Sequence, residues 1–342
     1  MRFYLRPLSF VYDQVVGVKN ALYDRGMIGS YKVPVPVISI GNLTVGGTGK
    51  TPITDFCLKQ LVQAGVRVAV VSRSYRALAK EPCLVDPKKE NAAGFYGDEP
   101  VLLSKSNPEV SVFVGPSKWK TVQYAVSENS FDLIIVDDGF QHRRLQRDLN
   151  IVILDATEVL SNYEVLPEGR ARESWSSLSR ADLILITKCN QASEEDLAAL
   201  EKNIPDNKEV LHFAYDIDHF RNQGGEAELS RDQFQDKKFF LVSAIARPDV
   251  FEKMMREIGK VAKHSLHYRD HHPYTAADVE KMTAEFKKSD SDYLVTTEKD
   301  AVKLQSLFPR PEMLWSASLK VSELGHKGRL YEIISQLLRP TL

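Results

Sequence analysis

A glycine-rich stretch near the beginning of the chain combines the residue types that bind phosphate groups. It reads Gly41-Asn42-Leu43-Thr44-Val45-Gly46-Gly47-Thr48-Gly49-Lys50-Thr51. Glycines let successive backbone N–H groups curl around phosphate oxygens. The residues ahead of the lysine are therefore expected to bind a nucleotide, and they are Gly46, Gly47, Thr48 and Gly49. Lys50 is placed to reach the β- and γ-phosphates, and Thr51 to offer its hydroxyl to Mg²⁺.

A second motif ends an apolar segment with two carboxylates. Residues 131–136 read Phe-Asp-Leu-Ile-Ile-Val and run directly into Asp137 and Asp138. Single aspartates after a strand mostly form turns. A pair at the carboxyl end of a buried parallel strand lies where such sheets bind ligands, and downstream of a phosphate loop it indicates Mg²⁺ coordination.

A third segment bears on the choice of base. Proteins that read guanine carry an N-K-x-D signal after a strand, and the corresponding place here reads Thr187-Lys188-Cys189-Asn190. Lys188 can stack under a base and is expected to contact the nucleotide. Because the aspartate that reads guanine is missing, the sequence favours adenine, and hence ATP.

These motifs need strands and helices that position them, and the sequence between them alternates accordingly. Short runs rich in β-branched residues occur at 34–40, 66–72, 110–114, 131–136, 151–155 and 182–187. Such runs are typical of strands buried on both faces of a parallel sheet. With helices expected at 51–63 and 117–128, the sequence predicts an α/β fold: a mostly parallel sheet of the P-loop NTPase type flanked by helices, over residues 29–205.

The rest of the chain predicts a second, smaller α/β lobe. Residues 206–236 are more polar and contain Gly224 and Gly225, so they predict a linker, with room for a short hairpin near 211–215. Strands are expected at 238–243, 263–268 and 293–296, and helices near 249–259 and 328–338. The second lobe is accordingly placed at 237–342.

Composition excludes several classes of protein. The chain has 342 residues and a net charge of -1, so a global electrostatic grip on nucleic acid is not expected. Its three cysteines, Cys57, Cys83 and Cys189, are far apart. Their spacing argues against a disulfide framework or a zinc knuckle and fits a reducing compartment.

The first 28 residues predict an amphipathic helix. Leu8, Val11, Val15, Val18 and Leu22 recur at spacings of three and four, with basic residues on either side. No run of 18 apolar residues predicts a membrane span, and no cleavage site predicts a secretory signal. Such a helix either lies in the headgroup region of a membrane or packs on the protein's own core, and the pattern leaves both open.

Several segments together resemble one family, the tetraacyldisaccharide 4′-kinases (lipid A 4′-kinases). The phosphate loop with Pro52 behind it looks like theirs. The other matching segments follow in the family's order: Val71-Ser72-Arg73 with Tyr75, Gly97-Asp98-Glu99-Pro100, Asp137-Asp138-Gly139-Phe140-Gln141-His142, Leu166-Pro167 with Gly169-Arg170 and Arg172-Glu173, Asp270-His271-His272, and Thr296-Thr297-Glu298-Lys299-Asp300. The segment that reads D-D-G-F-Q-H is highly specific. The chain departs from the family at Ser74 and Arg76, where glycines are usual.

The resemblance implies a reaction and a set of roles. The γ-phosphoryl group of ATP moves, with Mg²⁺, to the 4′-hydroxyl of an acylated glucosamine disaccharide 1-phosphate, at the cytoplasmic face of the inner membrane of a Gram-negative-type bacterium. The protein is then peripheral, held by its N-terminal helix, with no obligate protein partner. Asp98 becomes the base and His271 its partner, although by residue type alone they read as a helix cap and an ordinary histidine.

The same resemblance places further residues at the site. Glu99 joins Asp137 and Asp138 near the metal, and Gln141 lies near the phosphates of the nucleotide. Arg73, His142 and Arg170 are expected to bind the lipid substrate, since an arginine fork matches phosphate oxygens.

Two other functions remain open from the residues alone. Val45 to Thr51 also resembles the loop of the deviant P-loop ATPases, which act on a protein or metal client. Those proteins usually carry a lysine where Val45 stands. A nucleotide-gated membrane adaptor without turnover is the other alternative.

Overall fold

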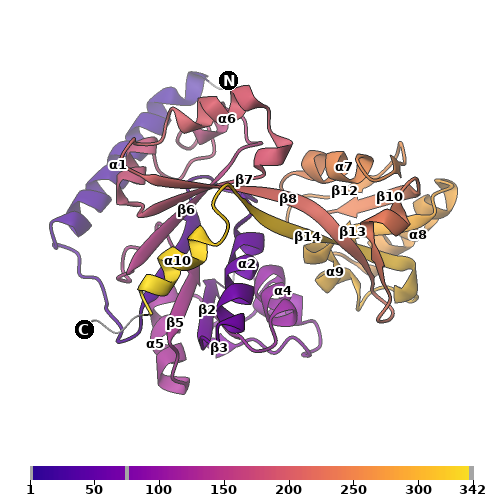
Figure 1. The fold of residues 1–342 in the computed structure, drawn as a ribbon, viewed down its shortest axis with the longest axis horizontal. Coiled ribbons are helices and arrows are strands. Elements are labelled where there is room, and N and C mark those ends of the chain that lie inside the picture. The colour runs from indigo at the N-terminus through magenta and orange to yellow at the C-terminus, as the bar shows by residue number, and fades with distance from the viewer. Residues whose placement is uncertain (1–2, 74–76, 339–342) are drawn as a thin grey trace.

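The strands of the chain join into one long, mixed sheet, which a computed structural model describes over residues 3–73 and 77–338. Within those residues fourteen strands take part, and the order along the sheet is β11-β10-β13-β14-β8-β7-β6-β1-β5-β2-β4-β3. Two lobes sit at the two ends of this sheet, and the long strands β8 and β14 run from one lobe into the other (Figure 1). Ser74 and Arg76, the departures from the family pattern, lie outside the described residues, as does Tyr75.

The first lobe contains the predicted parallel sheet. Its strands are β1 (Val37–Asn42), β2 (Val68–Arg73), β4 (Ser111–Gly115), β5 (Leu133–Asp137), β6 (Leu149–Asp155) and β7 (Leu183–Thr187), with the short antiparallel edge strand β3 (Cys83–Leu84). All six residues of β1 are buried, because β5 and β6 pair with it on either side and helices cover both faces. The predicted P-loop fold of the α/β class is confirmed.

Helices of the first lobe follow the strands that they connect. They are α2 (Lys50–Gln63), α3 (Ala92–Tyr96), α4 (Asp98–Ser106), α5 (Lys118–Glu128) and α6 (Glu194–Glu201). Helix α2 begins directly after the glycine-rich loop, so its positive end faces the place where phosphates are expected.

The segment 206–236 connects the two lobes as part of the sheet and not as an irregular loop (Figure 1). It contains the fourteen-residue strand β8 (Glu209–Asn222), which pairs in parallel with β7 and antiparallel with β14 (Leu314–Leu324). A hairpin does form within this segment, but it joins the end of β8 to β9 (Glu228–Ser230), where Arg221 pairs with Glu228, whereas residues 211–215 lie inside the single strand β8. Alternate residues Leu211, Phe213, Tyr215 and Ile217 are buried, but Ala214 between them is buried too, so the period of two is incomplete.

The second lobe is built on β10 (Lys238–Ser243) and β13 (Tyr293–Thr297), with the short strands β11 (Lys260–Val261) and β12 (Leu266–His267). Its helices are α7 (Pro248–Arg256), α8 (Ala276–Lys288) and α9 (Glu298–Leu304). The final helix, α10 (Arg329–Gln336), returns to the first lobe and packs against α2 (Figure 1). The second lobe therefore does not include this helix, although it was predicted to extend to residue 342.

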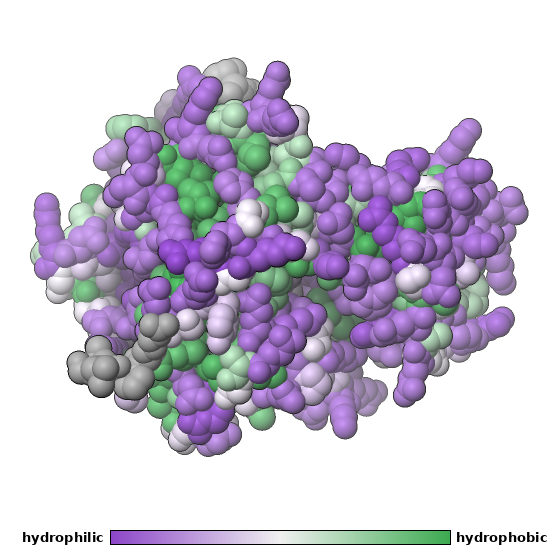
Figure 2. All heavy atoms as spheres, in the orientation of Figure 1, coloured by the Kyte–Doolittle hydropathy of each residue, from purple (hydrophilic) through white to green (hydrophobic). Residues whose placement is uncertain are grey.

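One apolar core runs through both lobes along β8. Ile40 and Ile53 of the first lobe belong to the same buried cluster as Phe239 and Met255 of the second. Between them the rings of Phe220 and Phe234 stack with their centroids 3.9 Å apart. Figure 2 shows apolar residues in the furrow where the lobes meet, whereas the outer surface of the second lobe is mostly hydrophilic.

The N-terminal helix α1 (Arg6–Asp24) lies on the first lobe with its polar side inward. Ser9 is buried and accepts a hydrogen bond from the backbone N–H of Glu168, and Asn20 donates one to Glu173 at 2.7 Å. The apolar stripe faces outward: Val11, Val15 and Val18 are 59%, 65% and 61% exposed. Within the described residues, no helix has both the length and the apolar character needed to cross a bilayer.

Candidate active site

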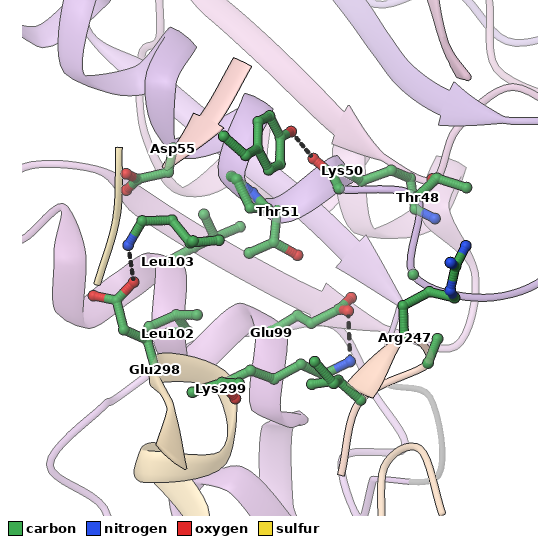
Figure 3. Close-up of a pocket in the computed structure, with 18 of the residues that line it drawn as sticks. Thr48, Lys50, Thr51, Asp55, Glu99, Leu102, Leu103, Arg247, Glu298 and Lys299 are labelled. Atoms are coloured by element: carbon green, nitrogen blue, oxygen red, sulfur yellow. Dashed lines mark hydrogen bonds and ion pairs between the residues drawn. The ribbon is translucent and has the colours of Figure 1, made fainter. Parts of the chain in front are cut away.

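A cleft of about 1200 Å³ opens between the lobes, and the glycine-rich loop forms one of its walls. Lys50 and Thr51 of α2 point into it from the first lobe. Glu99 on α4 and Lys299 on α9 line it together as an ion pair, and Arg247 lies on the side near Thr48 (Figure 3).

The glycines of the loop are needed for its backbone. Gly49 has a φ of +84°, in the left-handed region that side chains disfavour, and it immediately precedes Lys50. The ammonium group of Lys50 lies 3.2 Å from the Asn42 side-chain oxygen and 3.6 Å from Asp138 Oδ1. Lys50 is thus held over the loop, where a nucleotide phosphate would take over these contacts.

Asp138 forms an ion pair with Arg172. Arg172 donates two hydrogen bonds to this carboxylate, at 2.9 and 2.7 Å, and Lys118 donates one to the Asp138 backbone oxygen. Burial disfavours the charge of Asp138, but Lys50, Arg172 and Lys118 outweigh it and hold the pKa of this carboxyl well below its usual range. Asp138 is therefore ionised and already neutralised by protein cations.

Asp137 has the opposite environment. Its Oδ2 accepts a hydrogen bond from Ser72, and Oδ1 is buried without a hydrogen-bond partner among the described residues. Burial and the nearby charge of Glu99 raise the pKa of Asp137 to about 6, in spite of Lys50. A buried carboxylate with an unpaired oxygen beside a second carboxylate suits a cation.

The donor set fits Mg²⁺. In residues 3–73 and 77–338, no three His, Cys, Asp or Glu side chains cluster closely enough to hold a metal by themselves. Mg²⁺ does not need such a cage, because it commonly binds one or two carboxylates together with nucleotide phosphates and water. Asp137, Glu99 and the hydroxyl of Thr51 are the residues of the cleft that meet this need.

Asp98 and His271 lie together where the lobes meet. Nδ1 of His271 is 3.1 Å from Asp98 Oδ2, and Lys303 lies 3.6 Å from the same oxygen. Burial disfavours ionised Asp98, but the hydrogen bond with His271 and the charge of Lys299 prevail, so the pKa of Asp98 is lowered. The hydrogen bond with Asp98 raises the pKa of His271 in turn.

Lys299 links this pair to Glu99. Its ammonium group lies 3.0 Å from Glu99 Oε1 and 3.3 Å from Nε2 of His271. Burial disfavours its charge, yet the carboxylates of Glu99, Asp98 and Asp270 raise its pKa. Lys299 therefore stays charged between two acids of the first lobe and the histidine of the second; Figure 3 shows its contact with Glu99.

Comparison with known proteins decides the family. The chain matches the family described as tetraacyldisaccharide-1-P 4′-kinase over residues 1–339. It is 68% identical to the tetraacyldisaccharide 4′-kinase of Bdellovibrio bacteriovorus, over 99% of this chain and 100% of that protein. The chain belongs to the tetraacyldisaccharide 4′-kinase family. The predicted membership in this family of lipid kinases is confirmed.

Two further relatives agree. The tetraacyldisaccharide 4′-kinase of Chlorobium luteolum is 34% identical over 98% of this chain and 97% of its own length. The crystal structure of LpxK from Aquifex aeolicus, described as an "apo" form in complex with ATP, superposes with a TM-score of 0.79 at 28% identity, covering 99% of both chains. ATP is thus bound by a protein with the fold of this kinase family.

The structure places the other predicted residues in different surroundings. Arg73 and Arg170 line the cleft. Gln141 donates to the backbone oxygen of Asn42 at 3.0 Å, behind the loop. His142 is half-buried, and burial together with the charges of Lys118 and Arg73 lowers its pKa to about 4. These roles remain predictions.

Lys188 lies beneath the phosphate loop. It is buried, forms an ion pair with Asp155 at 2.5 Å and approaches the backbone oxygen of Gly47 at 3.5 Å. These contacts tie its ammonium group to the loop backbone. Contact with a nucleotide base remains a prediction.

Three cations that shape the site were not predicted as site residues. They are Lys118, Arg172 and Lys299. Arg172 and Lys299 lie inside segments that resemble the family, so their position was a usable signal. The sequence around Lys118 carried no such signal, because the burial of Lys118 depends on how α5 packs beside the loop that follows β5.

Proposed function

We propose that this kinase transfers the γ-phosphoryl group of ATP to the 4′-hydroxyl of a tetraacyldisaccharide 1-phosphate. The names of its relatives, the ATP complex of the Aquifex protein and the phosphate loop beside an acid–histidine pair support this reaction. The observation that carries the proposal is the contact between Asp98 and His271 at the edge of the cleft that holds Lys50.

The chemistry asks the protein mainly for positioning and charge. Asp98, ionised, accepts the proton of the 4′-hydroxyl as the sugar oxygen attacks the γ-phosphorus. The new O–P bond forms while the bond to the bridging β–γ oxygen breaks, and ADP leaves. His271, the partner of this base, donates from Nδ1–H to the Asp98 carboxylate and so orients it. Lys50 neutralises charge on the transferred group.

We place Mg²⁺ next to Oδ1 of Asp137, the oxygen without a hydrogen-bond partner among the described residues. We assign Asp137, Glu99 and Thr51 as its protein ligands, and bound Mg²⁺ would neutralise charge on the β- and γ-phosphates. Asp138, also expected near the metal, keeps Arg172 and Lys50 in place from its position beside Asp137.

The lipid headgroup is assigned to the basic side of the first lobe. Arg73 and Arg170 line the cleft, and the charges of Arg73 and Lys118 act on His142. Guanidinium forks and a neutral imidazole provide donors for a sugar phosphate.

The membrane contact is assigned to α1. Its polar side is tied to the first lobe at Glu168 and Glu173, and its apolar stripe is exposed. An outward apolar stripe flanked by basic residues suits the headgroup region, which supports a peripheral position at the cytoplasmic face of an inner membrane. No obligate protein partner is included in this proposal.

The proposal is tested by transfer of labelled γ-phosphate from ATP to tetraacyldisaccharide 1-phosphate in mixed micelles with Mg²⁺. Native protein should label the lipid, and Asp98→Ala should lower the rate at least ~100-fold. The matched control is Asp290→Ala, an exposed acid of the second lobe, which should keep full activity. ATP hydrolysis without labelled lipid would instead favour an ATPase that acts on another client.

A further inference from the structure

Tyr215 connects strand β8 to the backbone of the phosphate loop. Its hydroxyl donates a hydrogen bond to the backbone oxygen of Gly49 at 2.8 Å. Its ring also lies against the Cα of Gly49, where a Cβ atom would come within 3.0 Å of ring carbon Cε2. The ring therefore contacts the left-handed residue that precedes Lys50.

The hydroxyl of Tyr215 is a permanent donor. The side chain is fully buried, and burial, with the charge of Asp155 in second place, raises its pKa well above the usual value. Gly49 O also accepts the first hydrogen bond of α2, from Ile53 N–H at 3.3 Å. Tyr215 thus helps to fix the point where the loop becomes helix.

Asn190 holds Tyr215 in turn. Its side-chain oxygen accepts from Tyr215 N–H at 3.0 Å, and its side-chain nitrogen donates to Tyr215 O at 3.1 Å. Asn190 stands where the N-K-x-D signal has its aspartate. An aspartate could accept the first bond but could not donate the second. The asparagine is therefore suited to positioning β8 and unsuited to reading guanine.

The neighbouring residues of this segment support the same loop. The Thr187 hydroxyl lies 3.0 Å from Thr48 O, with Leu154 O a second acceptor at 3.2 Å, and Lys188 approaches Gly47 O. Three successive carbonyl oxygens of the loop, those of Gly47, Thr48 and Gly49, thus have partners in this segment or in Tyr215. When these carbonyl oxygens are hydrogen-bonded to the protein, the N–H groups of the loop point the other way, toward the place where phosphates are expected.

We propose that Tyr215, held by Asn190, is a positioning residue that fixes the phosphate loop for ATP. The inference rests on the proposed use of ATP at this loop and adds a residue that acts on the loop backbone through Gly49. Removing the hydroxyl should loosen Gly49 and Lys50 while leaving the lipid side of the cleft intact.

The test compares Tyr215→Phe with native protein in two assays: calorimetric titration of ATP with Mg²⁺, and steady-state kinetics with each substrate varied. Loss of one buried hydrogen bond predicts about tenfold weaker ATP binding and a matching rise in the KM for ATP, with the KM for lipid unchanged. Asn190→Asp should act in the same direction. ATP binding is read directly, so the result stands apart from whether the lipid is the acceptor.

Tyr96→Phe is the matched control. Tyr96 is also buried, and it lies on α3, whose residues do not line the cleft. Both phenylalanine variants should lose similar thermal stability, but only Tyr215→Phe should weaken ATP binding. Unchanged ATP affinity in Tyr215→Phe would overturn the proposal. Equal losses in both variants, or a parallel rise in both KM values, would also overturn it, since they indicate general destabilisation.

Discussion

Nδ1 of His271 lies 3.1 Å from a carboxylate oxygen of Asp98, although 173 positions separate the two residues. Asp98 begins α4 in the first lobe, and His271 follows β12 in the second. His271 adopts a φ of +58°, so a tight turn directs its ring toward the first lobe. The pair therefore depends on the contact between the two lobes at this edge.

The dependence of the pair on both lobes predicts a non-additive loss. His271→Gln should lower phosphoryl transfer by about 100-fold, because Asp98 loses its orienting partner. In the double variant Asp98→Asn/His271→Gln, the loss should stay close to that of Asp98→Asn alone, since residues that act as a unit do not add. Rates with ATP and lipid saturating provide the measurement.

The control for this cycle is His326→Gln, an exposed histidine of the loop before α10, which should keep full activity. ATP affinity should be unchanged in all these variants. Losses of the two single variants that multiply in the double variant would separate His271 from Asp98 and contradict the pair.

Arg172 predicts a second effect, on the phosphate side of the cleft. Arg172→Lys cannot reproduce the two parallel hydrogen bonds to Asp138, so Lys50 and Asp138 should lose their fixed arrangement. We expect transfer activity to fall by roughly tenfold or more, the equivalent of one charge-assisted hydrogen bond.

The matched control is Arg67→Lys. Arg67 also binds an aspartate, Asp132, through two hydrogen bonds at 3.1 and 2.6 Å, but this pair is exposed on the surface. Exposed ion pairs contribute little, so activity and melting temperature should both stay near native values. If Arg172→Lys and Arg67→Lys lower the transfer rate by the same factor, the buried position of Arg172 has no special role.

The sequence was sufficient for the phosphate loop and for the parallel strands that carry it. Runs such as residues 131–136 are apolar throughout, so burial on both faces could be inferred without tertiary information. Strand β8 was missed for the opposite reason: Asp216, Asp218 and Arg221 are interleaved with its buried residues, and its pairing with β7 and β14 joins it to the sheet. Long-range pairing of this kind leaves a weak local signal.

The residues of the candidate site also fall into two groups, those that local motifs predict and those that only tertiary contacts bring together. Lys50 and Asp137 belong to local motifs, and their chemistry follows from residue type and spacing. Asp98 and His271 came only from the family resemblance, because a helix-starting aspartate and a lone histidine have common structural explanations. Tyr215 had no local signal, since its contact with Gly49 joins residues 166 positions apart.

His142 predicts a pH effect on stability. Burial, with the charges of Lys118 and Arg73, lowers its pKa from 6.5 to about 4. The folded protein therefore binds fewer protons at His142 than the unfolded chain between these values, so stability is full above pH 6.5 and falls toward pH 4. Chemical denaturation from pH 7.5 to 4.5 should show a smaller loss of stability for His142→Gln than for native protein. Equal slopes in the two proteins would show that His142 does not titrate in this way.

The exposed stripe of α1 predicts that membrane binding and folding can be separated. In Val11→Ser/Val15→Ser/Val18→Ser, the changed side chains already face solvent, so the free energy of unfolding should change by less than about 0.5 kcal/mol per site. Sedimentation with anionic vesicles should fall about tenfold or more, because three apolar side chains no longer enter the lipid. The control is Leu84→Ser, an exposed leucine on the edge strand β3, which should leave sedimentation unchanged. A triple variant that melts well below native protein would instead mean that the stripe packs against the protein, and binding at native strength would remove α1 as the membrane contact.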